Sequence, residues 1–176
     1  MNMISVEYIV SQVFVIFAVL TFGFSYLTKD KKKIMILVTM TSLFYGVEYF
    51  LLGALSGVAV NIISIIRNVW FYINAKNNKK NSVWILIILS ALLVILGIIT
   101  YTNIFSIIPI VATIMFTYSV WQDNNKVYKY MAVPMSIMWI VYNFICGSIL
   151  GVIAESVILI FEIVGIMRYE KQGQLI

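Results

Sequence analysis

The sequence predicts an all-α membrane protein with seven transmembrane helices. Hydrophobic residues make up 62% of its 176 residues, and the mean hydropathy is +1.02. A soluble domain of this size needs more polar surface than such a composition supplies. Only 11% of the residues are charged, and most of them stand in short clusters between long apolar segments. Lipid is therefore the expected solvent for most of the chain.

Seven apolar segments have the length that crosses a bilayer, about 17 to 25 residues. They are expected at residues 8–28, 34–52, 57–73, 83–101, 104–121, 130–147 and 151–168. The residues before the first segment contain no basic cluster and no small-residue cleavage motif. We therefore expect a retained helix there rather than a signal peptide.

The basic residues predict how the chain is oriented. Eleven of the 12 lysines and arginines fall in the clusters after the first, third, fifth and seventh segments: Lys29, Lys31, Lys32, Lys33, Lys76, Lys79, Lys80, Lys126, Lys129, Arg168 and Lys171. Cytoplasmic loops are enriched in such residues. This predicts a multi-pass protein of the cytoplasmic membrane with its N-terminus outside and its C-terminus inside. Because topology accounts for the net charge of +5, the expected partner is the lipid bilayer and not a nucleic acid.

The side-chain inventory disfavours catalysis and metal binding. The chain has no histidine and one cysteine, so zinc sites and histidine-based triads lack their main components. Asp30 and Asp123 stand in loops, which disfavours an aspartate pair inside the bilayer. Cys146 is expected to be a small buried hydrophobe. We therefore expect no enzyme, no catalytic residue, no metal and no cofactor.

An internal repeat emerges when the chain is compared with itself at a shift of 94 residues. The shift pairs serines, valines, phenylalanines and glycines of the two halves: Ser25 with Ser119, Ser42 with Ser136, Val47 with Val141, Phe50 with Phe144, Gly53 with Gly147, Gly57 with Gly151 and Val58 with Val152. It superposes the first three segments on the last three, which indicates a duplication. The predicted organisation is a three-helix repeat over 1–81, a linker helix over 82–103, and a second repeat with a cytoplasmic tail over 104–176. The odd linker helix lets both repeats share one orientation.

Two of the predicted helices carry a polar stripe. In the third segment the stripe occupies positions separated by four, three and four residues: Gly57, Asn61, Ser64 and Asn68. Such spacing places them on one helix face. The shift of 94 maps Asn61 onto Glu155 and Asn68 onto Glu162. A carboxylate inside a membrane costs about 2.5 to 3.5 kcal/mol, so both stripes are expected to face a common interior axis.

Arg67 is the basic residue that topology leaves unexplained. It lies at nearly the same depth as Glu162, about 15 Å from the outer end of its helix at a rise of 1.5 Å per residue. A charge pair, with Asn68 beside it, would form a gate in the cytoplasmic half. The alternative is that Arg67 extends to the inner interface beside Asn68 while Glu162 bonds neighbouring helices. Glu48, near the outer end of its helix, is expected at a solvated mouth.

The arrangement of three, one and three helices with an outer N-terminus resembles the SWEET and PQ-loop transporter superfamily. The chain length and the stretch from Leu43-Phe44-Tyr45-Gly46 to Asn61 look like its small bacterial YgjV-like inner membrane branch. This resemblance implies an inner membrane location and a substrate site between the two repeats.

The resemblance also assigns roles to particular residues. In sugar-transporting members, a tryptophan on the second helix of each repeat and an asparagine on the third line the cavity. Trp139 with Tyr142 resembles the former, Asn61 resembles the latter, and their repeat mates are Tyr45 and Glu155. Pro109 matches the hinge proline of a repeat's first helix, although a static kink stays open. Trp139 is suited to stacking on a ligand and to packing in a core, because its buried N–H needs a partner in both cases.

The leading prediction is a transporter, passive or proton-coupled, for a small polar solute such as a sugar or nucleoside-like molecule. Alternating access between two repeats would move the solute. The predicted binding residues are Asn61, Glu155, Trp139, Tyr45, Tyr142 and Asn143. The alternative is a non-transporting sensor or complex subunit, in which the polar stripes only join helices. Assembly into a homo-oligomer is left open.

Overall fold

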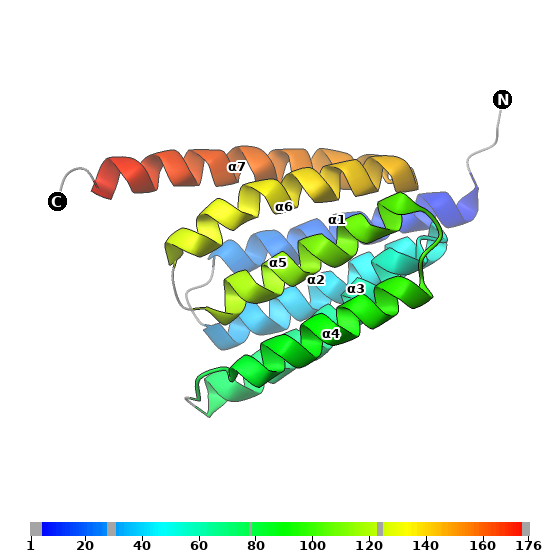
Figure 1. Ribbon diagram of the computed structural model, residues 1–176. Helices are drawn as coiled ribbons and strands as arrows, with labels where there is room; N and C mark the ends of the chain where they lie inside the picture. Colours follow the sequence, from blue (N-terminus) through cyan, green and yellow to red (C-terminus); the bar gives the residue numbers. More distant parts are fainter. Residues whose placement is uncertain (1–4, 28–30, 78, 123–124, 174–176) are drawn as a thin grey trace.

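The computed structural model describes residues 5–27, 31–77, 79–122 and 125–173, which form seven α-helices and one short 3-10 helix (Figure 1). In chain order these are α1 (Val6–Leu27), α2 (Lys31–Leu51), α3 (Leu55–Lys76), α4 (Val83–Ile99), η1 (Ile104–Ser106), α5 (Ile107–Trp121), α6 (Asn125–Cys146) and α7 (Ile149–Gly173). Successive helices run in opposite directions, and the two ends of the chain lie at opposite ends of the bundle (Figure 1). The predicted all-α class with seven long helices is confirmed.

Helix boundaries differ from the predicted ones mostly at polar ends. The predicted segment 130–147 begins earlier, at Asn125, and the segment 151–168 extends to Gly173. Hydropathy marks only the apolar middle of a helix, whereas backbone hydrogen bonding continues into its polar turns. The predicted segment 104–121 is divided into η1 and α5. Asn103 caps η1 by accepting a hydrogen bond from the Phe105 N–H at 2.9 Å.

The helices other than α4 form a closed ring. The principal neighbours around it are α1 with α2, α2 with α3, α3 with α5, α5 with α6, α6 with α7, and α7 with α1. The shift of 94 residues relates the α3–α5 interface to the α7–α1 interface, and each half has its second helix in the middle. Helix α4 packs outside the ring against α3 and α5. The apolar cluster that joins it comprises Val60, Ile63, Leu89, Leu93 and Ile110.

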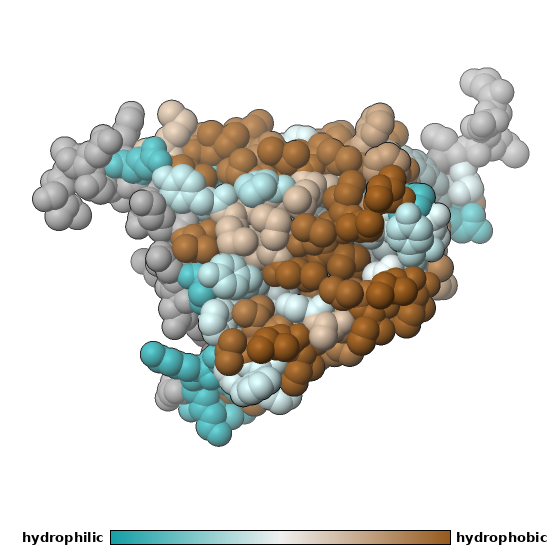
Figure 2. All heavy atoms as spheres, viewed as in Figure 1, coloured by the Kyte–Doolittle hydropathy of each residue, from teal (hydrophilic) through white to brown (hydrophobic). Residues whose placement is uncertain are grey.

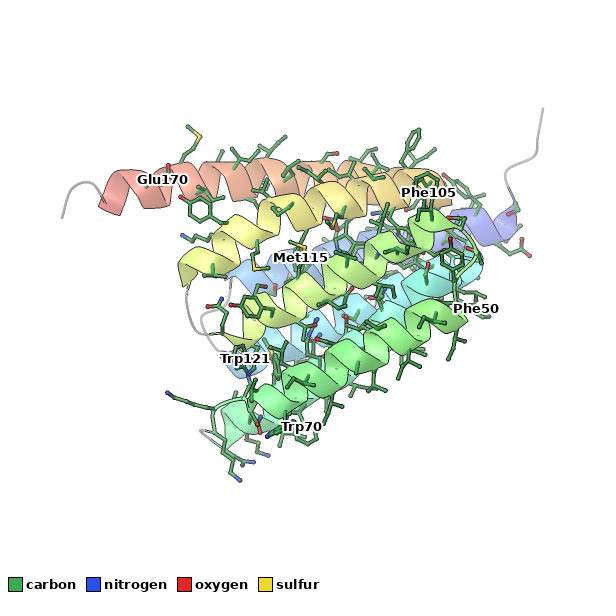
Figure 3. All side chains as sticks on the ribbon, in the orientation of Figure 1. Phe50, Trp70, Phe105, Met115, Trp121 and Glu170 are labelled. Atoms are coloured by element: carbon green, nitrogen blue, oxygen red, sulfur yellow. The ribbon has the colours of Figure 1, made fainter. Side chains whose placement is uncertain are left out.

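The bundle has two chemically distinct ends. We call the end at which α1, α3, α5 and α7 terminate the lysine end, because Lys33, Lys76, Lys79 and Lys80 are exposed there and Lys129 is half-buried. Lys29 lies outside the described residues, as do the side chains of Lys31, Lys32, Lys126, Arg168 and Lys171. The opposite end, which we call the glycine end, carries the α2–α3 and α6–α7 turns. Figure 3 shows Trp70 and Trp121 towards the lysine end and Phe50 and Phe105 near the glycine end.

The two turns at the glycine end share one geometry. Gly53 and Gly147, which the shift of 94 relates, both have positive φ, at 69° and 75°. The Ala54 N–H donates to the Tyr49 carbonyl at 2.8 Å, and the Ser148 N–H donates to the Asn143 carbonyl at 2.9 Å. These are the bonds of a Schellman motif, which needs a left-handed residue that glycine adopts without strain. The two turns that the sequence shift pairs thus share one local backbone structure.

The distribution of polar side chains is reversed relative to a soluble protein. Large hydrophobic side chains are exposed on the outside, among them Phe144 at 77%, Ile98 at 72% and Phe161 at 71%. Buried positions instead include polar residues such as Thr117 and Ser11, both 0% exposed. Hydrophobic residues cover the middle of the face shown in Figure 2, and hydrophilic ones gather at its ends. An apolar exterior around a polar interior suits a lipid solvent.

Within the described part of the chain, four segments are long and apolar enough to cross a membrane: Val6–Ser25, Leu55–Lys76, Ile104–Trp121 and Ile149–Met167. Met35–Leu51 and Val83–Ile99 are apolar but shorter. The lysines at the start of α2 lower the hydropathy of that helix. A proline and several polar residues lower the hydropathy of α6. Both helices nevertheless lie alongside the others in the same bundle (Figure 1).

Candidate functional site: a polar cavity between the two halves

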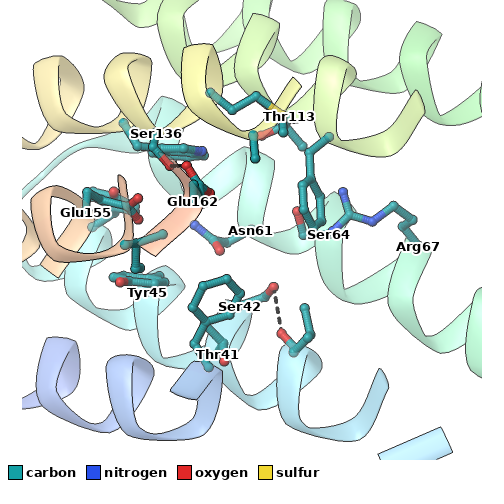
Figure 4. Close-up of a pocket in the computed structure, with 18 residues that line it drawn as sticks. Thr41, Ser42, Tyr45, Asn61, Ser64, Arg67, Thr113, Ser136, Glu155 and Glu162 are labelled. Atoms are coloured by element: carbon teal, nitrogen blue, oxygen red, sulfur yellow. Dashed lines mark hydrogen bonds between the residues drawn. The ribbon is translucent and has the colours of Figure 1, made fainter. Parts of the chain in front are cut away.

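A cavity of about 140 Å³ lies inside the ring of helices. Every lining residue comes from α1–α3 or α5–α7: Phe22, Val38, Thr41, Ser42, Tyr45, Tyr49, Asn61, Ser64, Arg67, Thr113, Phe116, Ala132, Met135, Ser136, Trp139, Glu155, Ile158 and Glu162. The side chains labelled in Figure 4 converge on this space from helices of both halves. The space is large enough for several water molecules or a small solute.

The cavity lining repeats with the sequence. Fourteen of the 18 lining residues form seven pairs separated by 94 positions: Phe22 and Phe116, Val38 and Ala132, Thr41 and Met135, Ser42 and Ser136, Tyr45 and Trp139, Asn61 and Glu155, and Ser64 and Ile158. Equivalent positions of both halves therefore face the same space. The two polar stripes predicted on the third and seventh helices meet there.

Four of the six predicted binding residues line the cavity. Asn61 and Glu155 are contributed by α3 and α7, and Tyr45 and Trp139 by α2 and α6. Tyr142 and Asn143 are placed differently. They are 3% and 1% exposed and lie outside the lining, because their polar atoms bond groups at the glycine end.

These groups form what we call the glycine-end cluster: Glu48, Tyr49, Ser56, Tyr142, Asn143 and Ser148. The Tyr49 hydroxyl donates to Asn143 Oδ1 at 2.7 Å, and the Tyr142 hydroxyl lies 2.8 Å from Ser56 Oγ. The Tyr142 hydroxyl also accepts from the Gly57 N–H at 2.9 Å. Each bond joins one half to the other, so the cluster links the two halves at the glycine end.

Two members of the cluster were not expected there. Glu48 was predicted at a solvated mouth, but it is 0% exposed and accepts a hydrogen bond from the Ser148 hydroxyl. Tyr49 was not singled out by the sequence. The repeat itself contains the signal, since Tyr49 lies 94 residues before Asn143 and the two side chains bond each other.

The side chain of Arg67 crosses from α3 to α5. Its NH1 donates to Thr117 Oγ1 at 3.1 Å, its Nε and NH2 donate to Asn68 Oδ1, and its guanidinium carbon lies 4.7 Å from the centre of the Phe116 ring. At 2% exposure, Arg67 does not extend to the interface, which was the alternative prediction. Glu162 lines the same cavity and accepts from Ser136 at 2.8 Å. Their pairing as a gate stays a prediction.

Pro109 is buried in the first turn of α5. In the first turn of a helix the missing N–H costs little, because those N–H groups have no partner within the helix. Pro134 instead lies inside α6, where a proline removes a backbone hydrogen bond. A hinge at Pro109 stays a prediction, and the interior proline of α6 is a second position at which the bundle can bend.

In the part of the chain that the structure describes, no group of three or more His, Cys, Asp or Glu side chains is placed to hold a metal ion. The chemistry available in the cavity is hydrogen bonding, charge and aromatic contact.

The exposed apolar belt, the buried polar groups and the cavity define a helical membrane protein with an internal polar site. The chain belongs to the Imp-YgjV family, described as bacterial inner membrane protein, which it matches over residues 9–173. It is similar to the inner membrane protein YgjV of Escherichia coli (strain K12), with 22% identity over 152 residues that cover 85% of this chain and 80% of that protein. No solved structure matches the chain. We therefore describe it as a bacterial inner membrane protein.

Proposed function

We propose that this protein transports a small polar solute across the inner membrane by alternating access between two like-oriented repeats. In this proposal α1–α3 and α5–α7 are the moving halves, α4 is the linker, and the N-terminus is outside. Transporters of this kind place the solute site between repeats related by an axis along the membrane normal. The predicted likeness to SWEET and PQ-loop transporters belongs to the same proposal.

The cavity lining carries the proposal. Its seven residue pairs separated by 94 positions support an axis through the cavity. The hydrogen bonds of the glycine-end cluster support a state closed on that side. The cavity lining extends towards the lysine end at Arg67 and Phe116. Opening the cluster while closing the far side would complete a transport cycle.

A sensor or complex subunit is the competing function. In that case, the polar residues would serve as contacts between helices, which are worth about 0.6 kcal/mol each on average. A packed interface between the halves would favour this alternative. The observed cavity, lined by Asn61 and Glu155 from facing helices, favours transport.

Reconstitution into proteoliposomes tests the proposal. A stability screen of the purified protein first identifies solutes, sugars and nucleosides included, that raise its unfolding temperature, because a ligand bound only to the folded form stabilises it. Labelled solute should then enter proteoliposomes faster than protein-free liposomes. Trp139→Ala and Glu155→Gln should each lose both the stabilisation and the uptake. A pH gradient that accelerates uptake indicates proton coupling, and an unchanged rate indicates a passive facilitator.

Binding without uptake would instead support a sensor. Full stabilisation and uptake in both variants would remove the cavity from the transport pathway. Glu7→Gln is the matched control, since Glu7 is exposed in the first turn of α1 and does not line the cavity.

A further inference from the structure

Resting on the proposed transport function, we propose that the solute carries a protonated amine, whose N–H groups are accepted by Glu155. The rings of Tyr45 and Trp139 contact the rest of the molecule. This assigns an organic cation, rather than a neutral polyol or an anion, to the cavity.

The facing helices α3 and α7 leave acceptor atoms open to the cavity. Glu155 has no hydrogen-bond partner among the described residues, although it lines the cavity from α7. Asn61, at 8% exposure, uses its Nδ2 to donate to the Gly57 carbonyl at 2.9 Å, so its Oδ1 is the atom available to a ligand. Glu162 uses Oε2 to accept from Ser136. A ligand that fits these groups must donate hydrogen bonds, as an ammonium group with three donors does.

The charged side chains of the lining also favour a cationic ligand. Among the lining residues, Glu155 and Glu162 are acids and Arg67 is a base. The guanidinium of Arg67 already donates to Asn68 and Thr117 and lies over the Phe116 ring. The half-buried carboxyl of Glu155 has no such bonds in the described part of the chain. A cleft lined mainly by one sign of charge attracts the opposite sign.

Aromatic rings form one wall of the cavity. The Tyr45 and Tyr49 rings are stacked at 6.3 Å, and the Tyr49 and Trp139 rings at 6.1 Å. Tyrosine and tryptophan faces attract organic cations through the ring quadrupole. Donors are present as well, since the hydroxyls of Tyr45 and Ser64 make no hydrogen bond within the described residues. A neutral polyol would use these donors, so the charge of the ligand is what the test has to separate.

Three probes with one aromatic ring separate charge from shape: benzylamine, which is protonated at neutral pH, benzyl alcohol and benzoate. The measurement is the unfolding temperature of the purified full-length protein with each probe. At about ten times its dissociation constant, benzylamine should raise this temperature by about 3 to 6 °C. Benzyl alcohol and benzoate at equal concentration should leave it unchanged.

Glu155→Gln keeps the size and removes the charge, so it should weaken benzylamine binding about tenfold to a hundredfold. Glu7→Gln should bind benzylamine as the wild type does. Equal stabilisation by benzyl alcohol, absence of stabilisation by benzylamine, or full binding in Glu155→Gln would each overturn the inference.

The test also separates this inference from the proposed function. Uptake of glucose or adenosine that requires Trp139, together with no benzylamine binding, rejects the cation and retains the transporter. Benzylamine binding without uptake of benzylamine into proteoliposomes retains the cation site and rejects transport.

Discussion

The two ends of the interface between the halves differ in how their polar groups are used. At the glycine end, the Tyr49 hydroxyl and the Asn143 amide of opposite halves bond each other at 2.7 Å. Farther from that end, on α3 and α7, Asn61 and Glu155 occupy equivalent positions but face a cavity. The interface between the two halves thus contains both a hydrogen-bonded and an open region.

Side-chain complementarity explains the difference. Two residues that are related by the repeat and touch each other must lie near its axis. Tyr49 supplies a donor and Asn143 an acceptor, so the Tyr49 hydroxyl and Asn143 Oδ1 satisfy each other. Asn61 donates within its own helix to Gly57, and Glu155 only accepts. The second pair therefore leaves polar atoms for a ligand.

The largest expected effect comes from exchanging charges in the open region. Arg67→Glu and Glu162→Arg should each lower solute uptake more than tenfold, because each places like charges around the cavity. The double variant Arg67→Glu/Glu162→Arg should recover uptake if the two side chains form the gate opposite the glycine-end cluster. Initial uptake rates in proteoliposomes provide the measurement.

Folding has to be separated from gating in that exchange, since Arg67 also bonds Thr117 on α5. Unfolding temperatures of all variants provide the control, and Arg67→Lys retains the charge with a smaller change. Uptake that stays lost in a folded double variant would argue against the gate.

Filling the close contact beside the cluster should have the next largest effect. A Cβ added at Gly57 would lie 2.6 Å from Cγ of Tyr49, whereas one added at Gly165 would meet nothing within 4 Å. Gly57→Ala should therefore lower the free energy of unfolding by about 1 to 3 kcal/mol. Gly165→Ala is the matched control and should be neutral or slightly stabilising. Equal unfolding temperatures for the two variants would contradict the packing at the glycine end.

Removing one hydroxyl tests whether the glycine-end cluster holds the cavity closed. Tyr49→Phe leaves Asn143, which is 1% exposed, without its donor, at a cost of about 1 to 3 kcal/mol. The closed state should then be less populated. Cys146, the single cysteine of the chain and the last residue of α6, reports this opening. Its alkylation rate should rise about fivefold or more.

Tyr118→Phe is the control for that experiment, because Tyr118 is 42% exposed on α5. An alkylation rate of Cys146 that is equal in Tyr49→Phe and the wild type would mean that the hydrogen bond does not control opening.

The sequence predicted the features that depend on periodicity and composition. Hydropathy and the shift of 94 predicted the helices, the pairing of Gly53 with Gly147 and the positions of Asn61, Glu155, Tyr45 and Trp139 on helices that line one cavity. These are regular properties of helices, since residues at the same phase face the same side.

What the sequence did not predict depends on partners in three dimensions. Glu48 reads as a mouth residue by depth, but Ser148 from the opposite half buries and bonds it. Tyr142 reads as a cavity residue by its place next to Trp139, but the following turn of α6 directs it at Ser56 and Gly57. Neither contact can be derived from one helix alone, because helix rotation is set by packing against its neighbours.

Two serines of the lining provide the smallest and most specific test of the open region. The Ser42 hydroxyl donates to the Val38 carbonyl at 3.1 Å, whereas Ser64 makes no hydrogen bond within the described residues and is free to bond a solute. Ser64→Ala should raise the KM for uptake about fivefold, the value of one hydrogen bond of about 1 kcal/mol, with an unchanged unfolding temperature. Ser42→Ala should leave the KM within about twofold. The residue that the shift of 94 pairs with Ser64 is Ile158, which supplies no second hydroxyl to the cavity. An equal KM in both variants would place the solute away from α3.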